Sequence, residues 1–257
     1  ETEILRFGHG IYGWRQVPVN IEVIGEKANA TRPEIEQIMI AGDHGKPDDS
    51  FETELYIIRR LIERRVLEEH IGDFYICSLS CRSLIYKGMF LAEQLTAFYP
   101  DLLDERFTSR FAIYHQRYST NTFPTWRMAQ PFRMIAHNGE INTLSGNLNW
   151  MKAHETRMAA DAFGTHMEDI QPVIQAGSSD SAALDAAFEL MVRAGRTAAL
   201  VTPDRALARR VAAELRRWEI EIDDSAGVPL AESPPGVFLR LAAELAALRR
   251  ESSRPAR

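Results

Sequence analysis

Four residues in three short polar segments could together bind an amino acid and hydrolyse an amide. Arg117 follows a His-Gln pair, Asn138 and Gly139 are adjacent, and Asp180 stands between two serines. An arginine can bind an α-carboxylate through two parallel hydrogen bonds, and a carboxylate can pair with an α-ammonium group. The Asn138 amide and the Gly139 backbone N–H are donors of the kind that stabilise an oxyanion. These residue types predict a site for a zwitterionic amino acid whose side-chain carbonyl is attacked.

The elements before these residues should position them. Phe111–Arg117 and Phe132–His137 are runs rich in β-forming residues that end in the polar segments, so we expect strands there. Ser179–Arg193 is predicted to be a helix, with Ser179 as its N-cap and Gly195 just beyond its end. An apolar stripe supports this helix: Leu184, Phe188 and Met191.

The rest of the N-terminal region predicts a mixture of helices and strands, and hence an α+β fold. A capping box with proline in the first turn suggests a helix over Thr31–Ile40, followed by a loop. Further helices are expected over Ser50–Glu69, Leu91–Phe98 and Asn147–Arg157, and strands over Phe74–Ser80 and Ser83–Lys87.

The overall composition is that of a globular protein. The chain has 257 residues, of which 45% are hydrophobic and 26% charged. Its formal charge of −6 argues against a general phosphate-binding surface. No apolar run reaches the roughly 18–20 residues that span a bilayer, and no signal-peptide pattern opens the sequence. Two cysteines do not make a disulfide framework, so a cytoplasmic location is expected.

The composition changes near residue 196. All seven histidines and all four lysines precede residue 170, whereas 13 of the 61 residues from Thr197 onward are alanine and 10 are arginine. We therefore divide the chain into a domain over residues 1–196, an Ala/Arg-rich extension over 197–250 and a disordered tail over 251–257. The extension is predicted to form a small βαβ unit followed by a helix.

Six longer segments carry a family resemblance. They are Tyr12–Pro18, Gly25–Glu34, His115–Pro124, Gln130–Arg133, His137–Thr143 and Asn149–Glu155. Through them, residues 1 to about 196 resemble the glutaminase domain, a class II glutamine amidotransferase, of the glutamate synthase large subunit. The resemblance implies an N-terminal-nucleophile hydrolase fold, a four-layer αββα sandwich. In that family an N-terminal cysteine attacks glutamine, with its own α-amine as base.

The resemblance also assigns roles and partners. It implies that Arg117 and Asp180 bind glutamine, and that Asn138 and Gly139 form the oxyanion hole. Ammonia then passes to synthase domains, where FMN and an iron–sulfur cluster serve the conversion of 2-oxoglutarate to glutamate. Those domains are absent from this chain, so no cofactor or metal is expected within it. The expected partners are glutamine and the missing synthase domains, with no membrane and no nucleic acid.

Two departures from the family qualify this expectation. The resemblance places the nucleophilic cysteine upstream of Glu1, and Cys77 and Cys81 cannot replace it because neither carries a free α-amine. We therefore expect this chain to be inactive alone; the alternative function is a non-catalytic glutamine-binding module. Residues 197 to about 244 resemble an early segment of AddB, a bacterial double-strand-break repair protein. A chimeric fragment with a DNA-repair-derived tail is thus a further alternative.

Each candidate residue also has a purely structural interpretation. Arg117 could serve an ion pair, Asn138-Gly139 could form a hairpin turn, and Asp180 could only cap its helix. The two cysteines, four positions apart, could suggest zinc, but no second pair of ligands completes a site, so buried or half-buried thiols are expected.

Overall fold

The computed structural model of the protein describes residues 1–42, 49–116, 123–137, 141, 143–158 and 161–195. By its internal contacts the chain divides into two compact units, Glu1–Thr197 and Ala198–Arg257. The predicted βαβ unit, last helix and tail lie in the second unit, outside the described residues.

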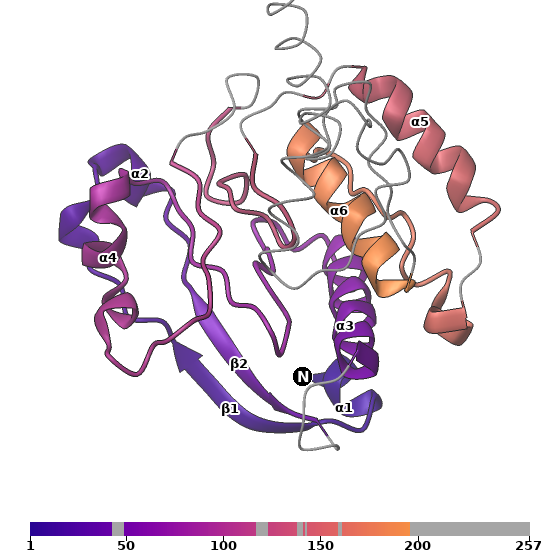
Figure 1. The fold of residues 1–257 in the computed structure, drawn as a ribbon, viewed down its shortest axis with the longest axis horizontal. Helices are drawn as coiled ribbons and strands as arrows, with labels where there is room; N and C mark the ends of the chain where they lie inside the picture. The colour runs from indigo at the N-terminus through magenta and orange to yellow at the C-terminus, as the bar shows by residue number, and fades with distance from the viewer. Residues whose placement is uncertain (43–48, 117–122, 138–140, 142, 159–160, 196–257) are drawn as a thin grey trace, which may run out of the picture. The chain divides into compact units, whose positions relative to one another are not determined.

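The described residues form an α+β structure with one small sheet (Figure 1). Strand β1, Gly10–Gln16, pairs antiparallel with β2, Glu36–Ala41. Gly10 lies opposite Ala41 and Gln16 opposite Glu36, with a shift in register between Ile11 and Gly13. The shift falls where Gly13 has φ of +144°, a conformation that residues with a side chain rarely adopt.

The helix predicted over Thr31–Ile40 is wrong. A short helix, α2, covers Glu26–Ala30 and ends where that prediction begins, and β2 occupies the second half of the predicted segment. Pro33 disfavours helical geometry at the residue before it. The β-branched residues that follow then pair with β1, and this pairing extends past the strands, since the Val17 N–H donates to the Ile35 carbonyl.

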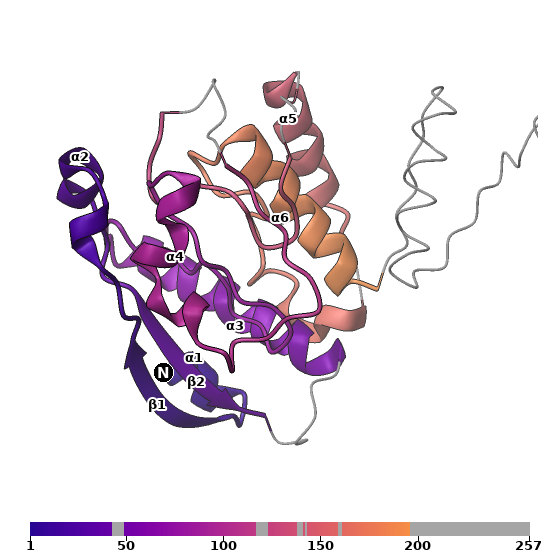
Figure 2. The ribbon, with the colours of Figure 1, turned by 60° about the vertical axis from the view of Figure 1, so that its left-hand side comes forward.

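Two long helices form the centre of the first unit. Helix α3 covers Asp49–Glu68 and α6 covers Asp180–Arg193, and the two contact each other (Figures 1 and 2). Helix α5, Leu144–Glu155, lies beside α6 in both views. Buried apolar side chains from α3, α6 and the segment between them make one core: Tyr56, Ile57, Phe163, Ile170, Val173 and Leu190.

The predictions of these three helices are confirmed to within three residues at each end. Ser179 caps α6 as predicted, because its hydroxyl accepts a hydrogen bond from the Ala182 N–H at 3.1 Å. The apolar stripe on α6 is not its buried face, however: Leu184 is 45% exposed and Met191 38% exposed. The buried face instead carries Asp180, Ser181, Ala183, Asp185, Glu189 and Leu190.

Short helical segments surround a second core beside the sheet. Its buried members are Val17, Phe98, Tyr99 and Trp126. The predicted helix Leu91–Phe98 is present as a 3₁₀ turn, η2, Ala92–Gln94, continuing into α4, Leu95–Phe98. The remaining short elements are α1 Thr2–Arg6, η1 Ile21–Val23, η3 Pro100–Leu103 and η4 Asp161–His166.

The predicted strands outside the β1–β2 sheet are wrong over their described residues, which are irregular. These are Phe74–Ser80, Ser83–Lys87, Phe111–Gln116 and Phe132–His137. In the last segment, side chains take the place of a neighbouring strand. The Asp185 carboxylate accepts hydrogen bonds from three consecutive backbone N–H groups, and Gln130 pairs with the backbone of His137. Backbone groups whose hydrogen bonds are made by side chains do not need a neighbouring β-strand as a partner.

Candidate functional site

The structure describes one of the four predicted site residues, Asp180. Arg117, Asn138 and Gly139 lie outside the described residues. The segments that lead to them are described as far as Gln116 and His137, and Ile141 is described on the far side. The geometry of the candidate site therefore rests on Asp180 and on the residues that hold these flanking segments.

Asp180 is the first residue of α6 and is 9% exposed. Its Oδ2 atom accepts a hydrogen bond from the Ile141 N–H at 2.9 Å. Its Oδ1 atom accepts from the N–H and hydroxyl of Ser181 at 2.7 and 3.2 Å. Burial opposes ionisation, but these hydrogen bonds outweigh it and lower the pKa of Asp180. Of the roughly four acceptor positions of this carboxylate, the described residues therefore fill three.

Asp185 lies further along the buried face of α6 and is 1% exposed. Its carboxylate accepts hydrogen bonds from the N–H groups of Arg133, Met134 and Ile135 at 3.1, 2.7 and 3.0 Å. Burial raises the pKa of Asp185, and these three donors offset part of that effect. One buried carboxylate thus fixes the backbone of the segment that leads towards His137.

The side chain of Gln130 binds the same segment at its end. Its Oε1 atom accepts from the His137 N–H at 2.9 Å, and its Nε2 group donates to the His137 carbonyl at 3.1 Å. The sequence interpretation missed the roles of both Gln130 and Asp185. Gln130 opens one of the segments that carried the family resemblance, and Asp185 is a carboxylate in an apolar stretch of α6, so both signals were present.

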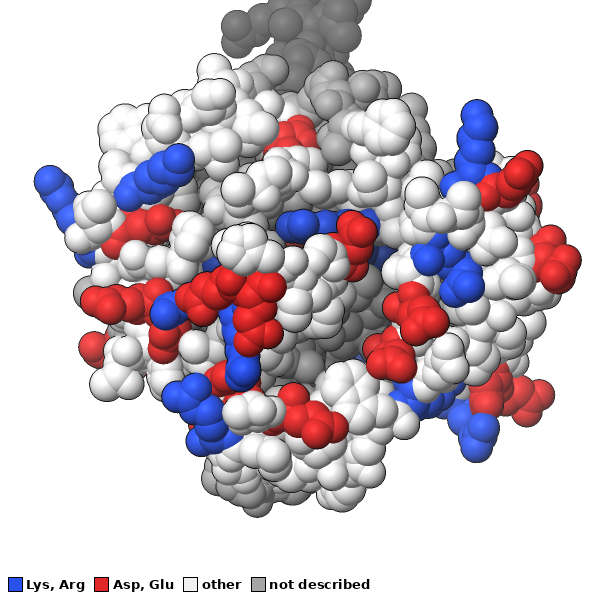
Figure 3. Space-filling model, turned by 180° about the vertical axis from the view of Figure 1, so that it is seen from behind, with Lys and Arg blue, Asp and Glu red and all other residues white. Residues whose placement is uncertain are grey.

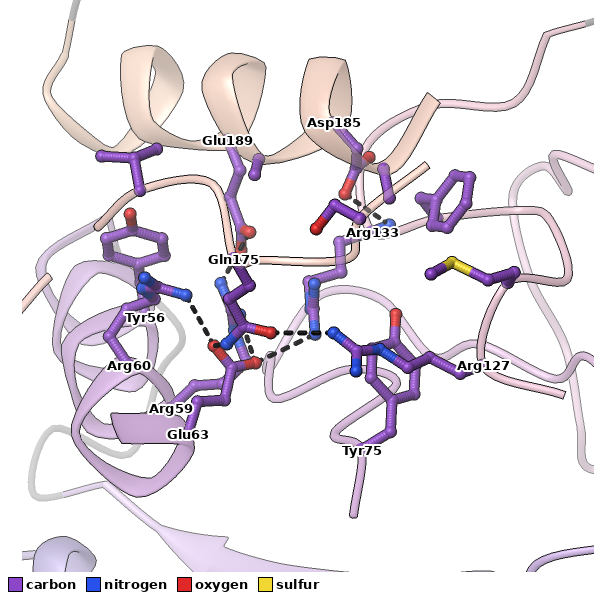
Figure 4. A pocket seen from close by; sticks show the side chains of 16 residues that line it. Tyr56, Arg59, Arg60, Glu63, Tyr75, Arg127, Arg133, Gln175, Asp185 and Glu189 are labelled. Atoms are coloured by element: carbon purple, nitrogen blue, oxygen red, sulfur yellow. Dashed lines mark hydrogen bonds and ion pairs between the residues drawn. The ribbon is translucent and has the colours of Figure 1, made fainter. Parts of the chain in front are cut away.

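A buried ion network joins α3 to α6 beneath this segment (Figure 4). Arg59 pairs with Glu63 and Glu189, each at 2.7 Å, while Arg60 and Arg133 pair with Glu63 at 2.8 and 3.2 Å. Burial disfavours the Glu63 carboxylate, but the charges of the three arginines outweigh it and lower the pKa of Glu63 to about 2. Glu63 therefore remains ionised at neutral pH.

The cavity around this network is small. It lies between α3, α6 and the loops that carry Tyr75, Arg127 and Gln175 (Figure 4). Its volume of about 40 Å³ is enough for a few water molecules and too small for an amino acid. Arg127 donates to the Gln175 side chain at 3.0 Å, and Gln175 donates to Glu63 at 3.0 Å. We interpret this cavity as part of the support of the site.

Both cysteines are free and half-buried, as predicted. Burial raises the pKa of Cys77. Burial, together with a hydrogen bond from its thiol to the Glu52 carboxylate at 3.0 Å, raises the pKa of Cys81 to about 11. The thiolate is the reactive form of cysteine, so neither side chain is prepared for nucleophilic attack at neutral pH.

The described residues carry no arrangement of three or more His, Cys, Asp or Glu side chains that could hold a metal ion. Within the same residues, every helix is too short or too polar to cross a lipid bilayer. On the face drawn in Figure 3, lysine and arginine side chains are interspersed with aspartate and glutamate. That face therefore presents mixed charge rather than a continuous basic surface.

Comparison with known proteins defines the family. The model of the class-II glutamine amidotransferases matches residues 1–203, which is most of the chain. The protein therefore belongs to the class-II glutamine amidotransferase family, as the resemblance implied. The match continues past residue 196, where the sequence predicted a boundary.

The similar proteins of known name are glutamate synthases. The chain is 74% identical over 201 residues to the glutamate synthase [NADPH] large chain of Azospirillum brasilense, and 46% identical over 202 residues to that of Bacillus subtilis. It is 48% identical over 191 residues to ferredoxin-dependent glutamate synthase 1 of Arabidopsis thaliana. These matches cover 74–78% of this chain but only 12–13% of the relatives' lengths.

Proposed function

We propose that this chain is the glutamine-binding part of a glutamate synthase. In this proposal glutamine is hydrolysed to glutamate and ammonia, and the ammonia is transferred to 2-oxoglutarate by synthase domains outside this chain. The observation that carries the proposal is the state of Asp180 in a member of this family. Asp180 is a largely buried carboxylate whose pKa is lowered, so it carries the negative charge that an α-ammonium group would pair with. The identity of 74% to a glutamate synthase large chain supports the choice of parent enzyme.

The proposed roles divide the substrate between its two ends. Arg117 binds the α-carboxylate through two parallel hydrogen bonds, and Asp180 binds the α-ammonium group. The Asn138 side chain and the Gly139 N–H donate to the side-chain carbonyl, where negative charge develops during attack. The direct hydrogen bond from the Ile141 N–H to Asp180 supports this division, because it ties the chain just beyond Gly139 to the residue that binds the other end.

The proposal extends to the fold and setting of the domain. The proposed fold is the four-layer αββα sandwich that the family resemblance implies. The described residues contain one antiparallel pair of strands, β1 and β2. FMN and the iron–sulfur cluster belong, in this proposal, to the synthase domains. Two free thiols suit a reducing cytoplasm.

We further propose that residues 1–257 bind glutamine without hydrolysing it. The family mechanism needs a thiol on a residue with a free α-amine, and both cysteines here are internal. Their raised pKa values also disfavour attack by either thiol. Ammonia release from glutamine by the purified polypeptide should equal the background. Turnover that survives the double substitution Cys77→Ala, Cys81→Ala would overturn this part of the proposal.

Calorimetry with matched ligands tests the binding proposal. L-Glutamine should bind, and glutaramate, which lacks the α-ammonium group, should bind at least about tenfold more weakly, as expected for loss of one charge-assisted contact. Asp180→Asn should reduce this preference, whereas Arg117→Ala should weaken both ligands because both keep the carboxylate. Arg106→Ala, which removes a surface pair with Asp104, is the control. A polypeptide that folds and binds neither ligand would refute the proposal.

A further inference from the structure

Gln130 holds His137 in the way that a neighbouring strand would. Its side-chain amide both donates to and accepts from the backbone of one residue, at 3.1 and 2.9 Å. Gln130 itself comes from the loop beside Lys87, whose buried ammonium group donates to the Arg127 and Ala129 carbonyls at 2.8 and 2.9 Å. The loop that carries Gln130 is therefore held in place by Lys87. Because of this, the two hydrogen bonds between Gln130 and the His137 backbone limit the movement of His137.

Asp185 holds the preceding part of the same segment from the opposite direction. Its three hydrogen bonds fix the backbone of residues 133–135, and the Phe132 N–H donates to the Ile135 carbonyl at 2.9 Å. The Arg133 side chain is tied in turn to Glu63 of α3 at 3.2 Å. An irregular segment without a strand partner is thus fixed by two helices.

The far side of the predicted oxyanion donors is tied to the same helix. The Ile141 N–H donates to Asp180, one turn and a half before Asp185 along α6. His137 and Ile141 flank Asn138–Glu140 in the sequence, and the backbone N–H groups of both donate to side chains. A backbone N–H donor cannot be adjusted by a side-chain rotamer, so its direction depends on how its flanks are held.

We propose that Gln130 and Asp185 are positioning residues for the carboxamide end of bound glutamine. The inference rests on the function proposed above, in which Asn138 and Gly139 donate to that end. Productive geometry in such sites is held within about 0.5 Å by supporting contacts. Gln130 and Asp185 supply such contacts to the segment that ends at His137, while Asp180 serves the α-ammonium end and the segment after Gly139.

The experiment separates this role from a general contribution to folding. Glutamine is compared with L-homoleucine, which keeps the α-ammonium and α-carboxylate groups but replaces the carboxamide with an isopropyl group. Affinities for both ligands are measured calorimetrically in the 257-residue chain and in Gln130→Met and Asp185→Asn. The control is Gln94→Met, because the Gln94 amide also bonds backbone groups, the Leu91 N–H at 2.7 Å and the Val23 carbonyl, but beside the other core.

The preference for glutamine over homoleucine should fall about tenfold in Gln130→Met and in Asp185→Asn, the loss of about one hydrogen bond. It should be unchanged in Gln94→Met, and homoleucine affinity should be unchanged in all three variants. Hydrogen exchange at the His137 amide should become faster in Gln130→Met than in Gln94→Met. If Asp185→Asn does not fold, Gln130→Met decides alone, since Gln130 is only partly buried.

Two failures can be told apart. A wild-type chain that binds glutamine, with variants that keep the preference or lose both ligands equally, overturns the positioning role and leaves the proposed function intact. A folded wild-type chain that binds no glutamine, although its His137 amide is protected, overturns the proposed function and the positioning role with it.

Discussion

The guanidinium group of Arg59 in α3 and the carboxylate of Glu189 in α6 form a buried ion pair of 2.7 Å across 130 positions of sequence. Arg59 also bonds Glu63, which pairs in turn with Arg60 and Arg133. The two helices are thus joined by charges that are shielded from water. Because α6 carries both Asp180 and Asp185, the alignment of the candidate site depends on this junction.

Removing the central carboxylate should destabilise the fold strongly. Glu63→Gln leaves three guanidinium groups without their shared anion, and breaking a buried pair from one side costs about 3–5 kcal/mol. Glu68→Gln is the matched control in the same helix, because the Glu68 side chain is 62% exposed and pairs only with Arg64 in the described residues. It should change the free energy of unfolding by less than about 0.5 kcal/mol. Urea denaturation measures both, and equal effects would refute the role assigned to Glu63.

The same carboxylate predicts a dependence of stability on pH. The pKa of Glu63 is lowered to about 2 in the folded state from an ordinary value of 4.5. Its contribution, on the order of 3 kcal/mol, is therefore fully present above pH 4.5 and is lost as pH falls towards 2. The difference in unfolding free energy between wild type and Glu63→Gln should shrink over that range. A difference independent of pH would contradict the assignment.

A methyl group at position 88 should disrupt the second core. A Cβ atom on Gly88 would overlap the rings of Trp126 and Phe90, whereas one on Gly72 would meet nothing within 4 Å. Overpacking of this kind costs about 1–3 kcal/mol. Gly88→Ala should lower the midpoint of thermal unfolding by several degrees and Gly72→Ala should not. Equal midpoints would show that the rings move aside without cost.

Cys81 should react slowly with alkylating reagents. With a pKa of about 11, its thiolate fraction at neutral pH is roughly 300-fold below that of an ordinary thiol with a pKa near 8.5. In a Cys77→Ala background, the rate of iodoacetamide modification should be correspondingly low. Glu52→Gln should raise this rate, because it removes the negative charge beside the thiol. Modification of the folded protein at the rate of a free thiol would contradict the proposed environment.

The sequence predicted the long helices but not the irregular segments. In α3, α5 and α6, apolar periodicity and a local cap such as Ser179 were sufficient, because both signals lie within the helix itself. The segment Phe132–His137 has the composition of a strand, yet its backbone is bonded to Gln130 and Asp185. Hydrogen bonds donated to a side chain some 50 positions away leave no periodic signal in the sequence.

The same distinction applies to the candidate site. Asp180 could be proposed from its residue type, its place at a helix start and the family resemblance. The hydrogen bond that Asp180 accepts from Ile141 could not be predicted in this way. Nor could the burial of Asp185 in place of the apolar residues Leu184 and Met191, because both features arise from packing between distant segments. The assignments of Arg117, Asn138 and Gly139 stay predictions, as do the origin and fold of residues 197–250.

The placement of Trp126 gives the protein an internal optical reporter. Trp126 is 8% exposed and its indole N–H donates to the Ala28 carbonyl, whereas Trp14 and Trp150 are 53% and 79% exposed. Emission from Trp126 should accordingly be blue-shifted relative to those two. A red shift in the emission of Trp126 would report the opening of the core around α4. It would do so whether that core opens before or after α3 and α6 separate.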